Sequence, residues 1–133
     1  LNSLDVPADR QNILRSEGGI WQPFSPQLLA DLQRQQRAVF VDVTADWCVT
    51  CQVNKQLVLE RKRVLQSFAK ADVKLLRADW TRPNDMIADY LLKYDRFGIP
   101  FNSLYLPDMV EPVIFSEILV AEKIINLLEN RLR

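Results

Sequence analysis

The segment that decides the fold is Ala38-Val-Phe-Val-Asp-Val-Thr44, followed at once by Ala45-Asp-Trp-Cys-Val-Thr-Cys51. Residues 38–44 are mainly β-branched and aromatic, which is typical of a short strand buried on both faces of a sheet. After the second cysteine, Val53, Leu57 and Val58 suit the inner face of a helix. The sequence therefore predicts a Cys-X-X-Cys motif at the point where a buried strand is followed by a helix.

Such a position favours thiol chemistry. The free N–H groups and the dipole at a helix start favour negative charge, so we expect the pKa of the Cys48 thiol to lie below the free value of about 8.5. Cys48 would then be the nucleophile. Cys51 lies one turn further along, where it can attack a mixed disulfide at Cys48 and release the partner in reduced form. The alternative is that both are buried structural cysteines.

Asp42 lies six residues before Cys48, inside the predicted strand. An ionised carboxylate is costly to bury without a partner, which predicts a raised pKa. If it lies beneath the cysteines, it can accept the proton of Cys51 when that thiol attacks. The alternative is an aspartate hydrogen-bonded at the end of the strand.

The cysteine count argues against a metal site. The chain has two cysteines and no histidine, whereas a zinc site usually takes four Cys, His or carboxylate ligands. The pair would have to recruit a second chain or two acids. We expect no metal, and no cofactor beyond a redox-active Cys48–Cys51 disulfide.

The composition is that of a single globular domain. Of 133 residues, 48% are hydrophobic and 26% are charged, enough to bury a core. Seventeen basic residues balance seventeen acidic ones, and without a basic stretch interleaved with aromatics we expect no nucleic-acid partner. No run approaches the roughly 20 apolar residues of a membrane helix. The chain begins with Leu1 rather than Met, so we expect a piece of a longer protein, with any membrane attachment elsewhere.

Residues 1–19 are mostly polar and contain Gly18-Gly19, which predicts a flexible lead-in before a domain over 20–133. Ser25-Pro26 fits the start of a helix over 26–36, with Trp21 and Phe24 packed beside it. The remaining pattern predicts a helix ending near residue 60, a second helical stretch after it, a strand over 73–78, a helix over 84–94, a hairpin of strands 102–106 and 110–115, and a helix over 120–132. This order indicates an α/β fold with a mixed central sheet and helices on both faces.

Asp42, the Ala45–Cys51 segment and Gly98-Ile99-Pro100 together resemble the thioredoxin superfamily. Within it, the Cys-Val-Thr-Cys segment followed by Ala78-Asp79-Trp80-Thr81 is most similar to the C-terminal periplasmic domain of transmembrane thiol:disulfide reductases of the DsbD and ScsB type. The residues 97–102 are also similar to that group. The resemblance implies a thioredoxin-like fold and a protein-disulfide reductase.

The family resemblance also implies partners and a location. It predicts a monomeric periplasmic domain of an inner-membrane protein, which takes electrons from a membrane-embedded reductase domain and passes them to periplasmic thioredoxin-fold or N-terminal partner domains. By the same resemblance, Cys48 is the nucleophile, Cys51 the resolving cysteine and Asp42 the buried acid. Pro100 would be a cis-proline that contacts substrate together with Ile99 and Trp47.

Two residues depart from the family pattern. Lys55 stands where close relatives tend to carry an acid; it could help the thiolates, or it could be an exposed helical lysine. Phe101 follows the proline where thioredoxins usually have a small polar residue, which could alter partner contact. Val49-Thr50 lacks the histidine of strong oxidants, which favours a reductase. A free-standing thioredoxin-like reductase and a non-catalytic binding module are the alternatives.

Overall fold

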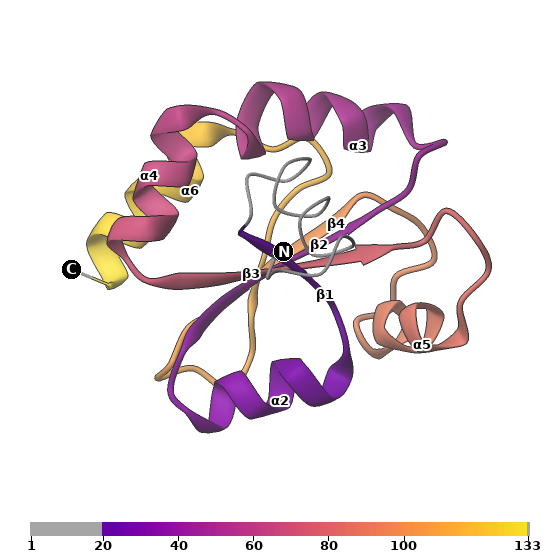
Figure 1. The fold of residues 1–133 in the computed structure, drawn as a ribbon, viewed down its shortest axis with the longest axis horizontal. Coiled ribbons are helices and arrows are strands. Elements are labelled where there is room, and N and C mark those ends of the chain that lie inside the picture. The colour runs from indigo at the N-terminus through magenta and orange to yellow at the C-terminus, as the bar shows by residue number, and fades with distance from the viewer. Residues whose placement is uncertain (1–19, 133) are drawn as a thin grey trace, which may run out of the picture.

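The computed structural model describes residues 20–132, which form one mixed five-stranded sheet with helices on both faces (Figure 1). The strand order is β1-β3-β2-β4-β5. Strands β1 and β2 run parallel to β3, β4 runs antiparallel to β2, and β5 antiparallel to β4. The strand bounds are Trp21–Pro23 (β1), Ala38–Thr44 (β2), Val73–Asp79 (β3), Phe101–Tyr105 (β4) and Val113–Ile114 (β5). The predicted α/β fold class is confirmed.

The helices form two layers around this sheet. The helix bounds are Pro26–Arg34 (α2), Val49–Asn54 (α3), Lys55–Leu59 (η1, a π-helix), Lys62–Lys70 (α4), Asp85–Lys93 (α5) and Ala121–Arg131 (α6). Helices α3, α4 and α6 cover one face, and α2 and α5 cover the other (Figure 1). Each face therefore has its own apolar core, and β2 contributes alternate side chains to both.

The central strand β2 is the part of the fold that the sequence described most fully. All seven of its residues are buried, as its β-branched and aromatic composition predicts. Phe40 packs against Phe68 on the α4 side, while Val39 and Val41 belong to the core on the α2 side. Asp42 has the same parity as Phe40 and so lies on the face covered by α3.

Local signals also place the helix starts. Ser25 caps α2 by accepting a hydrogen bond from the Leu28 N–H at 3.0 Å, and Asn84 caps α5 through the Ile87 N–H at 3.1 Å. These side chains satisfy backbone donors that have no partner within the helix. The predicted interruption near Glu60 is confirmed, since η1 ends at Leu59 and α4 starts at Lys62.

Three predictions of detail are wrong. Trp21 does not pack beside α2: it lies in a strand that was not predicted, and its side chain belongs to the core on the opposite face, against Phe40. A strand of three residues is too short to show a periodicity of its own.

The inner face of the helical segment after Cys48 also differs from the prediction. Val53 and Leu57 are exposed, and the buried side of α3 and η1 is formed by Cys51, Asn54, Val58 and Leu59.

The closing pair of strands, β4 and β5, is shorter than the sequence predicted. Strand β5 is limited to Val113–Ile114, so the connection from β4 is much longer than the turn at Pro107-Asp108. The predicted lead-in over 1–19 lies outside the described residues. Among residues 20–132, none of the helices combines the length and apolar character needed to cross a bilayer.

Candidate active site

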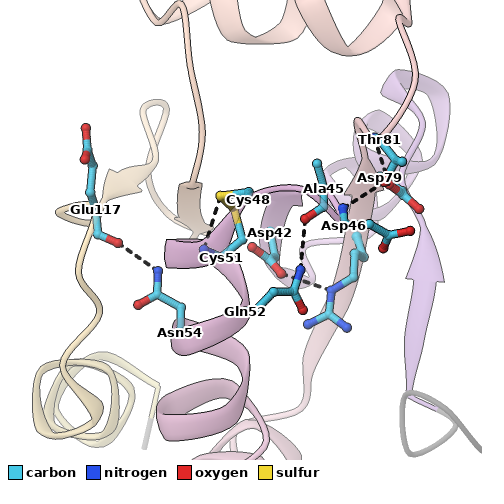
Figure 2. The surroundings of a disulfide bond; sticks show 11 residues. Asp42, Ala45, Asp46, Cys48, Cys51, Gln52, Asn54, Asp79, Thr81 and Glu117 are labelled. Atoms are coloured by element: carbon cyan, nitrogen blue, oxygen red, sulfur yellow. Dashed lines mark hydrogen bonds and ion pairs between the residues drawn. A yellow bond between two sulfur atoms is a disulfide. The ribbon is translucent and has the colours of Figure 1, made fainter.

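The two cysteines form a disulfide at the start of α3 (Figure 2). Cys48 is the N-cap residue, and its Sγ accepts a hydrogen bond from the Cys51 N–H at 3.2 Å. Cys48 is 6% exposed and Cys51 is 2% exposed. The sulfur of Cys48 thus occupies the position where the helix start offers a backbone donor to a developing negative charge.

The segment before the disulfide is fixed by hydrogen bonds to two neighbouring elements. The Asp46 N–H donates to Thr81 Oγ1 at 2.9 Å, and the Trp47 Nε1–H donates to the Thr81 carbonyl at 3.1 Å. From the other side, Gln52 Nε2 donates to the Ala45 carbonyl at 2.9 Å (Figure 2). Trp47 is held next to the disulfide while 61% of the residue stays exposed.

The Ile99–Pro100 peptide bond is cis, as the resemblance to the thioredoxin superfamily implies. Ile99 is half-buried and packs against the small cluster of Ala45, Cys48 and Cys51. Phe101 is buried in the core on the α2 and α5 side. Its side chain therefore lies inside the core rather than on the surface beside the cis-proline.

Asp42 lies on the same face of the sheet as α3, and Figure 2 shows its side chain between the strand and the first turn of that helix. Its Oδ2 accepts a hydrogen bond from Arg77 Nε at 3.0 Å, with both side chains almost fully buried. Burial raises the pKa of Asp42 to about 7, and the positive charge of Lys55 acts in the opposite direction. Asp42 can therefore exchange a proton near neutral pH.

Two cations act on this carboxyl group. Burial lowers the pKa of Arg77 to about 10, while the charge of Asp79 opposes that shift, so Arg77 is charged at neutral pH. Its guanidinium also lies 3.9 Å from the centre of the Trp21 ring. Lys55 is half-buried and electrostatically coupled to Asp42. It is not the freely exposed helical lysine that the sequence allowed as an alternative.

The surface next to the disulfide is apolar. Trp47 and Val49 flank Cys48 and are both largely exposed, and Phe97, just before the cis-proline loop, is 82% exposed. Exposed aromatic and aliphatic side chains of this kind are typical of surfaces that bind other proteins.

A family model described as thioredoxin-like matches residues 20–107. This chain belongs to the thioredoxin-like family. Among curated proteins, the domain is 38% identical over 72 residues to the thiol:disulfide interchange protein DsbD of Pseudomonas sp. (strain JR1 / K1), which is 54% of this chain and 12% of that protein. It is 37% identical over 76 residues to DsbD of Yersinia pestis (strain Pestoides F), 56% of this chain and 12% of that protein. The match thus spans about an eighth of these relatives.

Solved structures agree on the fold of this thioredoxin-like domain. The oxidised C-terminal domain of Neisseria meningitidis DsbD superposes with a TM-score of 0.62 at 23% identity, covering 83% of this chain and 99% of that one. Chloroplastic thioredoxin z superposes with a TM-score of 0.59 at 18% identity, covering 82% and 91%. The predicted resemblance to DsbD is confirmed. The curated relatives carry the name thiol:disulfide interchange protein, and this chain has a Cys48–Cys51 disulfide in its thioredoxin-like fold.

The structure places Asp42 and Ile99 beside the disulfide, with Trp47 and Pro100 next to them in the chain. It also shows Arg77 at this site, a residue that the sequence analysis missed. Arg77 has a signal in the sequence: it is the charged residue of an otherwise apolar alternation Val73, Leu75, Arg77 in β3. That strand pairs with β2 in a register that sets Arg77 beside Asp42, but the register cannot be derived from one strand alone.

Asn54 was also missed. This buried side chain donates from Nδ2 to the Glu117 carbonyl at 2.7 Å and accepts from the Leu119 N–H at 3.0 Å. It ties the end of α3 to the segment before α6 (Figure 2). Within residues 20–132, no group of three or more Cys, Asp or Glu side chains is arranged to hold a metal ion.

Proposed function

We propose that this thioredoxin-like domain relays electrons from a membrane-embedded reductase domain to periplasmic partner thiol proteins through the Cys48/Cys51 dithiol. The observation that carries the proposal is the disulfide at the start of α3, above a buried acid and beside a cis-proline loop. The relatives named DsbD support it, since their printed name is thiol:disulfide interchange protein.

The reaction is a two-electron exchange in two steps. The Cys48 thiolate attacks one sulfur of a partner disulfide, a mixed disulfide forms, and the second partner sulfur leaves as a thiolate. The Cys51 thiolate then attacks the Cys48 sulfur, which forms the Cys48–Cys51 disulfide and releases the partner as a dithiol. A donor dithiol reverses both steps and returns two electrons to the domain.

Asp42 acts as the proton acceptor in this scheme. Cys51 must lose a proton before it attacks, and a carboxyl group with a pKa of about 7 takes up and returns protons near neutral pH. The buried Arg77 stabilises the carboxylate between the two events. Asp42 therefore serves the resolving cysteine, while the helix start serves Cys48.

Trp47, Ile99 and Pro100 form the substrate-binding surface of the proposal. Trp47 is held by Thr81 in an exposed position beside Cys48, and Ile99 contacts the disulfide cluster just before the cis bond. The domain would act as a monomer on the periplasmic side of the inner membrane, with no bound cofactor.

The test is capture of partners by a variant that cannot resolve the intermediate. Cys51→Ser should accumulate mixed disulfides at Cys48 in periplasmic extract, because the second step is lost while the first remains. The adducts are separated on non-reducing gels and identified by mass. Cys48→Ser is the matched control and should trap none of them.

The outcomes separate the candidate functions. A membrane reductase domain and a periplasmic thiol protein among the adducts support the relay. Adducts with reductase substrates but no membrane donor point to a free-standing reductase. If Cys51→Ser and Cys48→Ser capture the same partners without covalent bonds, the domain is a binding module and the relay is rejected.

A further inference from the structure

Asn102 is a buried amide that the proposed exchange reaction does not use. It lies in β4, two residues after the cis-proline, and is 2% exposed. Neither Nδ2 nor Oδ1 of its side chain makes a hydrogen bond to another group within residues 20–132. Buried amides are nearly always hydrogen-bonded, because an unpaired polar group destabilises the fold. An apolar residue would fit this place in the core at lower cost.

The sheet register limits what this amide can reach. Asn102 lies directly opposite Asp42 in the β2–β4 pair, so the two side chains share a face with Cβ atoms about 5 Å apart. On its other side, the Phe115 N–H donates to the Asn102 carbonyl, and the half-buried ring of Phe115 packs against the apolar core. Along the chain, the neighbours on the same face are Pro100 and Leu104, both apolar. Asp42 is therefore the charged group directly opposite this amide in the sheet.

Asp42 has a polar or charged side chain beside it on each of the two neighbouring strands, Asn102 on β4 and Arg77 on β3. In β3, Arg77 stands at the same level and donates to Oδ2 at 3.0 Å. In η1, Lys55 acts on Asp42 through its charge, and α3 brings the two cysteines over the same face. Thr44, next on this face of β2, is uncharged and has a buried hydroxyl without a hydrogen bond in the described part of the chain. The central row across three strands is thus cation, carboxyl and amide.

We propose that Asn102 is a positioning residue for Asp42: its side-chain N–H donates to the charged carboxylate, directly or through one water molecule. A carboxylate only accepts hydrogen bonds, and a bond to the charged form is stronger than one to the neutral form. The terminal torsion of asparagine is soft, so the amide can turn toward Asp42 when the charge appears. Asn102 would thereby favour the charge state of Asp42 that accepts the proton of Cys51, a role that rests on the proposed function.

The direct test is a titration of the Asp42 carboxyl group by NMR in the complete chain labelled with ¹³C-aspartate. Asn102→Leu removes both polar atoms at similar volume, and should raise the pKa of Asp42 by about one unit, a tenfold change in proton affinity. The pH profile of disulfide reduction by dithiothreitol should move by the same amount. In an Asp42→Asn background, Asn102→Leu should leave that profile unchanged.

Ser103→Ala is the matched control, because it removes a buried polar side chain from the next position of β4, on the opposite face. It should leave the titration of Asp42 at its wild-type position. If Asn102→Leu does not fold, the wild-type chain still provides a test: the side-chain amide resonances of Asn102 should titrate together with Asp42 and become independent of pH in Asp42→Asn.

An unchanged or lowered pKa of Asp42 in folded Asn102→Leu, or amide resonances that do not follow Asp42, would overturn the role of Asn102. Neither measurement uses a partner protein. If Cys48 traps no partner but Asn102 and Asp42 still titrate together, the relay is rejected and the positioning role is kept. If Cys48 traps partners but Asn102 and Asp42 do not titrate together, the relay is kept and the positioning role is rejected.

Discussion

Asp42 is almost fully buried, so its environment differs strongly from that of the same side chain in water. Its pKa rises from 3.8 to about 7, mainly because burial penalises the charged form. Between these two values, the folded chain holds a proton that the unfolded chain has released. The free energy of unfolding therefore falls as the pH rises from about 4 to 7.

We expect this single group to reduce the free energy of unfolding by about 2 to 3 kcal/mol between pH 5 and pH 8, an order-of-magnitude value from the shift to about 7. Asp42→Asn removes the titration, so its stability should depend less on pH by that amount. Urea denaturation of the disulfide form at both pH values measures the difference. An equal dependence on pH for wild type and Asp42→Asn would contradict the prediction.

The elements around the disulfide are held by side chains that reach across the fold rather than by the length of the helix. Helix α3 has six residues before it continues as the π-helix η1. A break of this kind within a helical segment often occurs at a functional site. Asn54 lies at the junction and fastens it to the segment before α6 through two hydrogen bonds.

Asn54→Ala should therefore destabilise the domain by about 1 to 3 kcal/mol, since it leaves the buried N–H of Leu119 without its acceptor. The change is measured by urea denaturation of the oxidised chain. Gln56→Ala, at an exposed position of η1, should shift the free energy of unfolding by less than about 0.5 kcal/mol. A similar loss for both variants would mean that the junction owes its stability to the helix itself.

At the scale of the whole molecule, the sheet joins two cores that both use β2. Strand β1 closes one edge by pairing with β3, far away in the sequence. Its Trp21 is 3% exposed and packs against Phe40 and the guanidinium of Arg77. This contact connects the edge of the sheet to the ion pair beneath the disulfide.

Trp21→Ala should lower the free energy of unfolding by about 3 to 5 kcal/mol, the usual cost of removing a large buried aromatic side chain. Trp47→Ala is the matched control, because Trp47 is 61% exposed, and its effect should stay below about 1 kcal/mol. Chemical denaturation followed by circular dichroism compares the two. If both variants lose the same stability, β1 is not part of the cooperative core.

Much of the site could be predicted because its signals are local. The buried strand, the Cys-X-X-Cys motif at the following helix start and the Ile99-Pro100 pair each lie within a few residues of one another. The alternation of side chains along a strand and the capping residue of a helix are likewise visible within a few residues of sequence. The sequence alone therefore determined where the thiols lie, that Asp42 is interior, and that the fold is α/β.

Only the tertiary structure decided what surrounds Asp42. Arg77, Asn102 and Lys55 come from three other elements, and strand register and helix packing bring them to one carboxyl group. Register depends on the fit of whole strands against one another, because a shift by one residue turns every side chain to the other face. The position and role of the cysteines could thus be predicted from one segment of the sequence. The charged and polar groups around Asp42 come together only once the sheet has formed.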